Sequence, residues 1–288
     1  MTAIAIVGTG RMGTAYAKRL IEADYDVTVW NRTPSRTSAA AEAGAKVAPD
    51  LATVAAAGTI LVSLTDAAAV EAATAELIRA GIAGKLIVDL STLLPEETRG
   101  IAEQVTAAGA EFLDCPVGGT VGPALKGQLL GMAGGTESAF ARAKPVLEQL
   151  CRRVEHLGPA GTGAQMKLAV NLPLAIYWKT LAEALTLLEG SGIAASTAVS
   201  LIADSSAGPT VLKNRAQVVI DTLNGTDQPG TFDIAGLAKD LDLALRQAQL
   251  TGRAMPLSEE TRKSYSNALS AGLGGFDGAS LTRYLSDA

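Results

Sequence analysis

The chain has 288 residues, 48% hydrophobic and 4% aromatic, which is enough to bury a large core and to form two domains. Its net charge of −5, with no basic run, argues against a nucleic-acid binder. Two cysteines, Cys115 and Cys151, do not make a disulfide framework. The first apolar run has no charged n-region or cleavage site, so we expect no secretory signal. We therefore expect a cytoplasmic protein with no membrane or nucleic-acid partner.

The chain starts with an apolar run at 4–7, a glycine-rich turn, an alanine-rich helical segment at 11–23 and a second apolar strand at 26–30. This βαβ order around a G-x-G-x-x-G turn is the context that a dinucleotide site requires. The first glycine permits the tight turn, the second lets the backbone approach a pyrophosphate, and the third lets helix and strand pack closely. The pyrophosphate would lie on the helix N-terminus. The expected cofactor-binding residues of this turn are Gly8, Thr9, Gly10, Arg11, Met12 and Gly13.

The end of the second strand indicates which nicotinamide cofactor is used. An NAD site usually places a carboxylate there for the ribose 2′-OH, but this chain has Asn31, followed by Arg32, Thr33 and Arg36. A guanidinium can bind a 2′-phosphate in bidentate fashion, so the sequence favours NADP(H). The alternative is that Arg32 is only a solvated loop residue.

Strand and helix patterns alternate through the first half, which predicts an α/β fold with a doubly wound, largely parallel sheet of Rossmann type. The predicted strands are 4–7, 26–30, 59–63, 85–89, 111–115, 128–132 and 153–157. The predicted helices between them include 34–43, 67–80, 95–108 and 136–150.

A glycine cluster at 158–163 punctuates the chain, and no convincing strand pattern follows it. The segments 164–190, 194–203, 209–221, 234–252 and 257–271 are predicted to be helices. We therefore expect an NADP-binding domain at 1–161 and an all-helical substrate and dimerisation domain at 162–288, led by a long interdomain helix. The apolar run 168–188 is broken by polar residues, which suits a helix buried against a second subunit of a homodimer better than a membrane span.

The chemistry has few candidates for an acid or base. The only histidine, His156, sits at an expected strand end and is interpreted as structural. One histidine and two distant cysteines make neither a typical zinc site nor a Ser-His-Asp triad, so no metal is expected. Lys167 and Asn171 are four residues apart and share one face of a mostly apolar helix, where desolvation would lower the pKa of the lysine. A surface lysine and a helix-bending asparagine is the alternative; Lys239 is equally compatible with a solvated helix charge.

Four separated segments resemble the β-hydroxyacid dehydrogenase family, which includes 3-hydroxyisobutyrate dehydrogenases and semialdehyde reductases. They are the glycine turn ending in R-M-G at 11–13, the D-L-S-T-L-L-P segment at 89–95, the D-C-P-V-G-G segment at 114–119, and the G-x-G…K…N segment at 161–171 with K-D-L at 239–241. The resemblance covers essentially the whole chain.

The resemblance implies a role for each matching residue. Lys167 is the general acid, Asn171 positions the substrate, Thr92 contacts the cofactor and substrate, and Lys239 reaches the cofactor. Leu64 and Thr65 correspond to residues that line the nicotinamide ribose, although a plain strand terminus is the alternative. The implied substrate loop is Gly118, Gly119 and Thr120.

One departure from the family pattern concerns that loop, because Gly118 replaces a serine that helps to bind a carboxylate. Imine reductases share the architecture and the N-R-T signal, but usually carry Asp or Tyr at the position of Lys167. We therefore expect NADPH-dependent reduction of a small aldehyde, ketone or keto acid, or oxidation of the hydroxyacid. Imine reduction on the same scaffold is the alternative, and a non-catalytic nucleotide-binding module is a third hypothesis.

Overall fold

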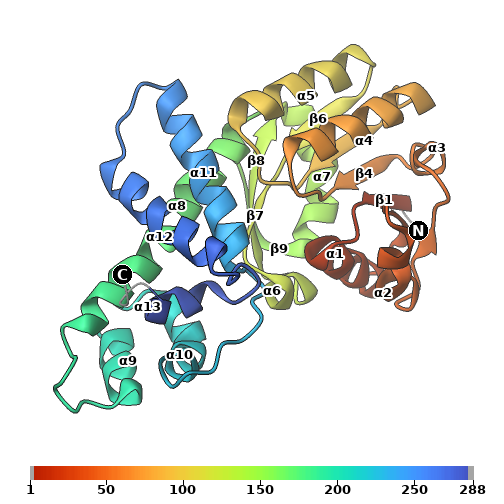
Figure 1. Cartoon of the computed structure of the whole chain (residues 1–288). Helices are drawn as coiled ribbons and strands as arrows, with labels where there is room; N and C mark the ends of the chain where they lie inside the picture. The colour runs from red at the N-terminus through yellow and green to blue at the C-terminus, as the bar shows by residue number, and fades with distance from the viewer. Residues whose placement is uncertain (1–2, 285–288) are drawn as a thin grey trace. The chain divides into compact units, whose positions relative to one another are not determined.

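The computed structural model describes residues 3–284, and the chain divides into two compact units, Met1–Lys167 and Leu168–Ala288 (Figure 1). The first unit holds the strands and the second is helical. Each unit is built around its own hydrophobic core. The family resemblance and the alternation of patterns predicted this α/β unit followed by an all-helical one, and the fold class is confirmed.

The described part of the first unit contains nine strands in one sheet, in the order β3-β2-β1-β4-β5-β6-β8-β7, with β9 paired to β8. The strands from β3 to β6 are parallel, whereas β8 is antiparallel to β6 and β7. The bounds are β1 (Ala3–Val7), β2 (Asp26–Trp30), β3 (Lys46–Val47), β4 (Thr59–Val62), β5 (Leu86–Asp89), β6 (Glu111–Asp114), β7 (Val117–Gly118), β8 (Leu129–Gly135) and β9 (Cys151–His156).

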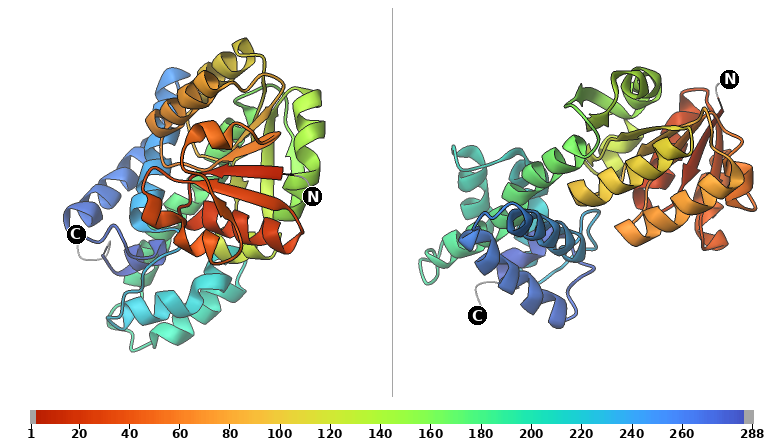
Figure 2. Two further views of the ribbon diagram at one scale, coloured as in Figure 1. Left: turned by 90° about the vertical axis from the view of Figure 1, so that its right-hand side faces the viewer. Right: turned by 90° about the horizontal axis from the view of Figure 1, so that it is seen from above.

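Helices cover both faces of this sheet because successive strand residues point to opposite sides. Ile4 and Ile6 of β1 pack in a cluster with α1 and α7, whereas Ala5 and Val7 pack in a second cluster with α4 and α5. Figure 2 shows α4 and α5 side by side. The helices of this unit are α1 (Arg11–Glu22), η1 (Pro34–Thr37), α2 (Ser38–Ala41), α3 (Leu51–Val54), α4 (Ala67–Ala80), α5 (Pro95–Ala107), α6 (Val121–Leu125) and α7 (Glu137–Leu150).

The seven predicted strands and the longer helices are confirmed to within a few residues at each end. The predicted helix at 34–43 is instead a 3-10 turn, η1, followed by the short α2. The elements β3, β7, α3 and α6 were missed because two to five residues carry no periodicity. β8 also runs three residues further than expected, through Ala133, Gly134 and Gly135. The prediction stopped short because glycines are depleted in strands.

The second unit is a helical assembly around Trp178, Leu212, Leu237 and Tyr265, which are buried. Within residues 3–284 no helix has both the length and the apolar character needed to cross a membrane. Extended pairing in this unit is limited, among its described residues, to two isolated bridges. Its helices are α8 (Thr162–Thr186), which starts in the first unit, α9 (Ala195–Asp204), α10 (Thr210–Leu223), α11 (Ile234–Leu250), α12 (Pro256–Ser270), η2 (Gly278–Ser280) and α13 (Leu281–Tyr284).

Tyr265 anchors α12 to α8, because its fully buried hydroxyl donates a hydrogen bond of 2.9 Å to the carbonyl oxygen of Ala175. Tyr265→Phe should lower the free energy of unfolding by about 0.5–1.5 kcal/mol, the usual net value of one hydrogen bond. Urea denaturation measures this change. Tyr25→Phe is the matched control, since the Tyr25 hydroxyl makes an exposed bond of 3.3 Å to Pro145. Equal stability losses in the two variants would contradict the assignment.

Candidate active site

The glycine-rich turn after β1 has two glycines that the fold requires and one that it leaves open. Gly8 has a φ of +98°, and a Cβ there would lie 2.2 Å from the carbonyl oxygen of Ser63. A Cβ on Gly13 would lie 1.9 Å from the carbonyl oxygen of Gly8. By contrast, apart from Gly10 itself and its two chain neighbours, no heavy atom lies within 4 Å of the Cβ position of Gly10. Packing therefore explains Gly8 and Gly13, whereas the open space at Gly10 fits a ligand that approaches the backbone.

Two further features of this turn suit an anionic ligand. The α1 helix begins after Gly10 without a side-chain cap, so its first-turn N–H groups keep their partial positive charge for another partner. Beside it, the Thr9 hydroxyl is buried and has no hydrogen-bond partner among the described residues. A buried polar group left unpaired is costly, which points to a missing partner. The turn thus fits the pyrophosphate of a dinucleotide.

The loop after β2 presents its cations to solvent. The Oδ1 atom of Asn31 accepts a hydrogen bond of 2.9 Å from the Thr33 N–H, which fixes the turn that follows the strand. Arg32, Thr33 and Arg36 are exposed. Neither arginine forms an ion pair with any residue between 3 and 284. Both guanidinium groups are therefore available to bind an anion.

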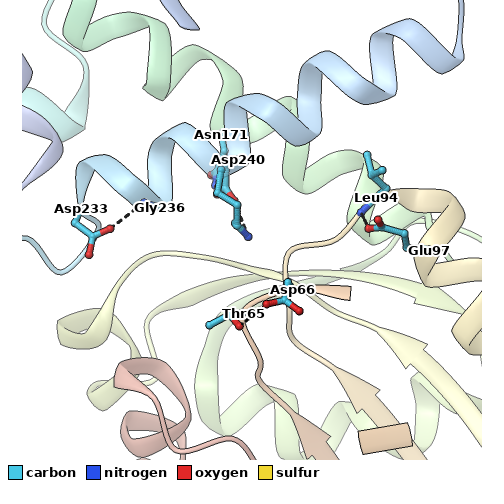
Figure 3. Close-up of polar contacts among 9 residues, drawn as sticks. Thr65, Asp66, Leu94, Glu97, Asn171, Asp233, Gly236 and Asp240 are labelled. Carbon is cyan, nitrogen blue, oxygen red and sulfur yellow. Dashed lines mark hydrogen bonds and ion pairs between the residues drawn. The ribbon is translucent and has the colours of Figure 1, made fainter. Parts of the chain in front are cut away.

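The loops after β4 and β5 are tied together through a buried carboxylate. The Leu64 N–H donates to the Ser91 hydroxyl at 3.1 Å, and the Ser91 N–H donates to Asp89 Oδ1 at 2.9 Å. Burial raises the pKa of Asp89 to about 6, although the Ser91 hydrogen bonds oppose that shift. Thr65 donates to Asp66 Oδ2 at 2.9 Å (Figure 3), and Asp66 caps α4. These bonds hold the segments that carry the predicted contacts Leu64, Thr65 and Thr92.

The strand order brings these loops to one edge of the sheet. The chain runs outward from β1 to β2 and β3, then returns to place β4 on the other side of β1. Since all these strands are parallel, the residues after β1, β2, β4 and β5 meet at their carboxyl ends. The point where strand order reverses is where doubly wound sheets bind ligands. The sequence-predicted cofactor residues of the first unit all lie there.

The predicted substrate loop follows β6 and includes β7. Gly119 has a φ of +119°, and a Cβ there would lie 2.7 Å from Leu129 Cδ2, so glycine is required. At Gly118 the nearest atom to an added Cβ would be Leu130 Cβ, at 3.5 Å, which is an ordinary contact. A Cβ atom therefore fits at position 118. The missing hydroxyl is therefore a chemical difference and is not imposed by packing.

Lys167 lies on α8 and is buried, with 8% of its surface exposed. The start of α8 is held by Asp114, at the end of β6. Its Oδ1 and Oδ2 atoms accept hydrogen bonds of 2.8 Å from the N–H groups of Gly161 and Ala164. Burial raises the pKa of Asp114 to about 6, and Asp89 adds to the rise, while the two N–H donors oppose it. The sequence analysis quoted Asp114 only as the start of the D-C-P-V-G-G segment and missed this link, because the two partners are 47 and 50 positions away.

Asn171 and Lys239 meet at Asp240 in the second unit. The Asn171 Nδ2 atom donates to Asp240 Oδ2 at 2.6 Å (Figure 3), and the Lys239 ammonium lies 3.0 Å from Asp240 Oδ1. Asn171 and Asp240 are both 5% exposed. Because a carboxylate only accepts hydrogen bonds, Asp240 fixes which end of the Asn171 amide faces it. Sequence reasoning quoted Asp240 only as part of the K-D-L segment and missed this link.

His156 has contacts that explain it structurally. Its Nε2 atom lies 2.8 Å from the Gly135 carbonyl oxygen, and its ring stacks on Phe140 with centroids 4.9 Å apart. Both partners belong to the packing of β8 and α7 next to β9. These contacts support the structural interpretation made from the sequence.

Comparisons with known proteins match the chain along its length. Residues 3–158 match the NAD binding domain of 6-phosphogluconate dehydrogenase, and residues 161–285 match the NAD-binding domain of NADP-dependent 3-hydroxyisobutyrate dehydrogenase. The chain is 34% identical to a 3-hydroxyisobutyrate dehydrogenase of Pseudomonas aeruginosa, covering 92% of each chain. It is 30% identical to glyoxylate/succinic semialdehyde reductase 1 of Arabidopsis thaliana, covering 95% of each.

Solved structures agree. The 3-hydroxyisobutyrate dehydrogenase of Mycobacterium tuberculosis, solved with L-serine, superposes with a TM-score of 0.89 at 29% identity, covering 99% of each chain. An imine reductase from a Pseudomonas species superposes with a TM-score of 0.67 at 20% identity over 99% of each chain, which is a likeness of fold alone. The homologues are named dehydrogenases and reductases, so the chain is an NAD(P)-dependent oxidoreductase. It belongs to the β-hydroxyacid dehydrogenase family.

Proposed function

We propose that this protein is an NADPH-dependent oxidoreductase that reduces a small aldehyde or keto acid, or oxidises the corresponding hydroxyacid, with Lys167 as the general acid. The observation that carries the proposal is the burial of Lys167, at 8% exposed, one helical turn before the equally buried Asn171. Burying an ammonium on a mainly apolar helix is costly for the fold alone. The cost is expected at a position that performs chemistry.

The residues divide the work. NADPH supplies the hydride, and Lys167 gives a proton to the carbonyl oxygen as that oxygen gains negative charge. Asn171 hydrogen-bonds to the substrate from an orientation that Asp240 fixes through its 2.6 Å bond. In the direction of oxidation Lys167 takes the hydroxyl proton instead. Lys239, ion-paired with Asp240, is proposed to contact the cofactor.

The preference for NADPH over NADH rests on the loop after β2. Arg32 and Arg36 are exposed there, and the strand ends in Asn31 where an NAD site usually has a carboxylate. A 2′-phosphate would gain charge-assisted hydrogen bonds from a guanidinium and meet no carboxylate at position 31. These features support NADPH.

The substrate class follows from Lys167 and Gly118. Lys167 suits a carbonyl oxygen that needs a proton, and the named relatives act on hydroxyisobutyrate, glyoxylate or succinic semialdehyde. Gly118 removes the hydroxyl of the family serine, which leaves the backbone N–H groups of Gly118 and Gly119 as donors for a carboxylate. A bulkier, less polar substrate fits this change as well. Imine reduction remains the second candidate, supported by a shared fold.

A homodimer through the helical domain is part of the proposal. Val170 of α8, Leu187 just beyond it and Leu201 of α9 are exposed, at 39%, 84% and 68% respectively. A second subunit that covered these helices would remove such aliphatic side chains from water, which supports the proposal.

Gly10 and Gly13 should separate cofactor binding from folding. Gly10→Ala adds a methyl group in the open space where the pyrophosphate is proposed to bind, so it should weaken NADPH binding at least tenfold. The same change should lower the free energy of unfolding by only about 0.5–1 kcal/mol, because it lies at the helix N-cap. Gly13→Ala forces a Cβ against the Gly8 carbonyl and should cost more, about 1–3 kcal/mol or above. Calorimetric titration and thermal unfolding measure the two effects. Unchanged NADPH affinity in Gly10→Ala would contradict the placement of the pyrophosphate.

Arg32 should carry much of the cofactor preference. Arg32→Gln removes one charge-assisted contact of roughly 1.5–3 kcal/mol, which corresponds to about a 10- to 150-fold loss in kcat/KM with NADPH and little change with NADH. Arg152→Gln, at an exposed arginine of β9, is the matched control and should leave both values unchanged. If the unsubstituted enzyme used both cofactors equally well, the NADPH assignment would be wrong.

Lys167→Ala tests the general acid. Its kcat for carbonyl reduction should fall by about 10²–10⁴-fold, the usual contribution of a positioned acid, while NADPH affinity stays nearly constant. A preformed cyclic iminium already carries its positive charge and needs no proton donor, so its reduction should fall far less. Lys144→Ala, at a solvated lysine of α7, controls for the loss of a charge. Near-normal carbonyl turnover in Lys167→Ala would show that the proton comes from another group.

A further inference from the structure

Asp114 is an aspartate where the fold alone would favour a neutral side chain. It is 2% exposed, and strand register places it directly beside Asp89, another buried carboxylate at 2% exposed. Two neighbouring buried carboxylates repel each other and lose hydration, which costs free energy unless each has strong partners. Asp89 has its partner in the loop that follows its own strand. Asp114 has both of its N–H partners in α8 and the turn that leads into it.

The Asp114 cap differs from the other helix caps of this chain. Asp50, Asp66 and Asp233 each accept a hydrogen bond from the N–H of a residue three positions later, so each caps only the N-terminus of its own helix. Asp114 accepts from residues 47 and 50 positions away, so it fixes the first turn of α8 relative to the end of β6. A carboxylate is favourable at this helix N-terminus because of the helix dipole.

The backbone closes tightly around this carboxylate. A Cβ on Gly163 would lie 2.7 Å from Asp114 Oδ2 and 2.2 Å from the Met132 carbonyl oxygen. A Cβ on Gly134 would lie 2.7 Å from Asp114 Oδ1. These glycines therefore let the first turn of α8 and the end of β8 approach the carboxylate on both sides. Gly163, four residues before Lys167, is therefore needed for the close approach of α8 to Asp114.

We infer that Asp114 is a positioning residue for Lys167, because it fixes the start of α8, the helix that carries Lys167, relative to the end of β6. Lys167 lies one helical turn after Ala164, the second residue that Asp114 binds. A helix rises about 1.5 Å and turns about 100° per residue. A shift of the first turn of α8 by one residue would therefore move the Lys167 ammonium further than a hydrogen bond tolerates. The inference rests on the proposed function of Lys167.

The test is Asp114→Asn, which keeps the shape but offers one acceptor oxygen for two N–H donors. The variant should fold, because removing one of two adjacent buried charges offsets the lost hydrogen bond. Its kcat for carbonyl reduction should fall by about 10- to 100-fold, as expected for a misplaced catalytic group, with the KM for NADPH within about twofold. Reduction of a preformed iminium should change by less than about threefold, since it does not need the acid. Should this variant not fold, Asp114→Ser supplies a shorter cap for the same comparison.

Hydrogen exchange gives a readout that does not depend on activity. The amides of 160–166 should exchange faster in Asp114→Asn than in the unsubstituted protein. Asp50→Asn is the matched control: Asp50 accepts two hydrogen bonds of 2.8 Å from Thr53 on α3, a helix that carries none of the proposed site. Asp50→Asn should leave exchange at 160–166 and the kcat for carbonyl reduction unchanged.

The outcomes separate the inference from the proposed function. Faster exchange at 160–166 with a normal kcat for carbonyl reduction would overturn the positioning role, and so would equal losses of carbonyl and iminium reduction. Unchanged exchange would show that the hydrogen bonds from Asp114 do not hold the start of α8. If the unsubstituted protein reduced no carbonyl compound, the proposed function would fail first. Faster exchange would then show that Asp114 holds the start of α8 without any effect on catalysis, which also contradicts the inference.

Discussion

The parallel alignment of β1, β2, β4, β5 and β6 is the constraint on which the nucleotide-binding unit depends. Because parallel strands end on the same side, every loop that follows one of them is delivered to a single edge. The glycine turn, the Asn31 loop, the Ser91–Leu64 link and the Asp114 carboxylate all lie at that edge. Strand burial enforces the alignment: a one-residue slip of β1 would exchange the faces of Ile4 and Ala5.

Much of this arrangement could be predicted from residue patterns. The strands with continuous apolar runs and the helices with apolar periodicity were found because each signal is local. The roles of Gly8 and Gly13 were also local, since a turn and a close packing contact involve neighbours along the chain. The same was true of the pairing of Lys167 with Asn171, which needs only a helix and a spacing of four.

The contacts that orient those residues could not be found this way. Asp240 reaches Asn171 across 69 positions, and Asp114 reaches the start of α8 across about fifty. No periodicity encodes which distant backbone N–H a carboxylate will accept. The short β3 and β7 were missed for a related reason, since two-residue strands exist only through their partners. The one signal for Asp114 that the sequence offered was a carboxylate at the end of an apolar strand.

The proposed reaction transfers hydride from NADPH to a carbonyl carbon, and Lys167 protonates the carbonyl oxygen. The most direct measurement is NADPH oxidation by the unsubstituted enzyme against a matched panel of semialdehydes, keto acids and cyclic imines. We predict turnover of aldehydes or keto acids at a kcat/KM well above that of any imine, with NADPH preferred to NADH. Turnover of imines alone, or NADPH binding with no turnover of any compound, would contradict it.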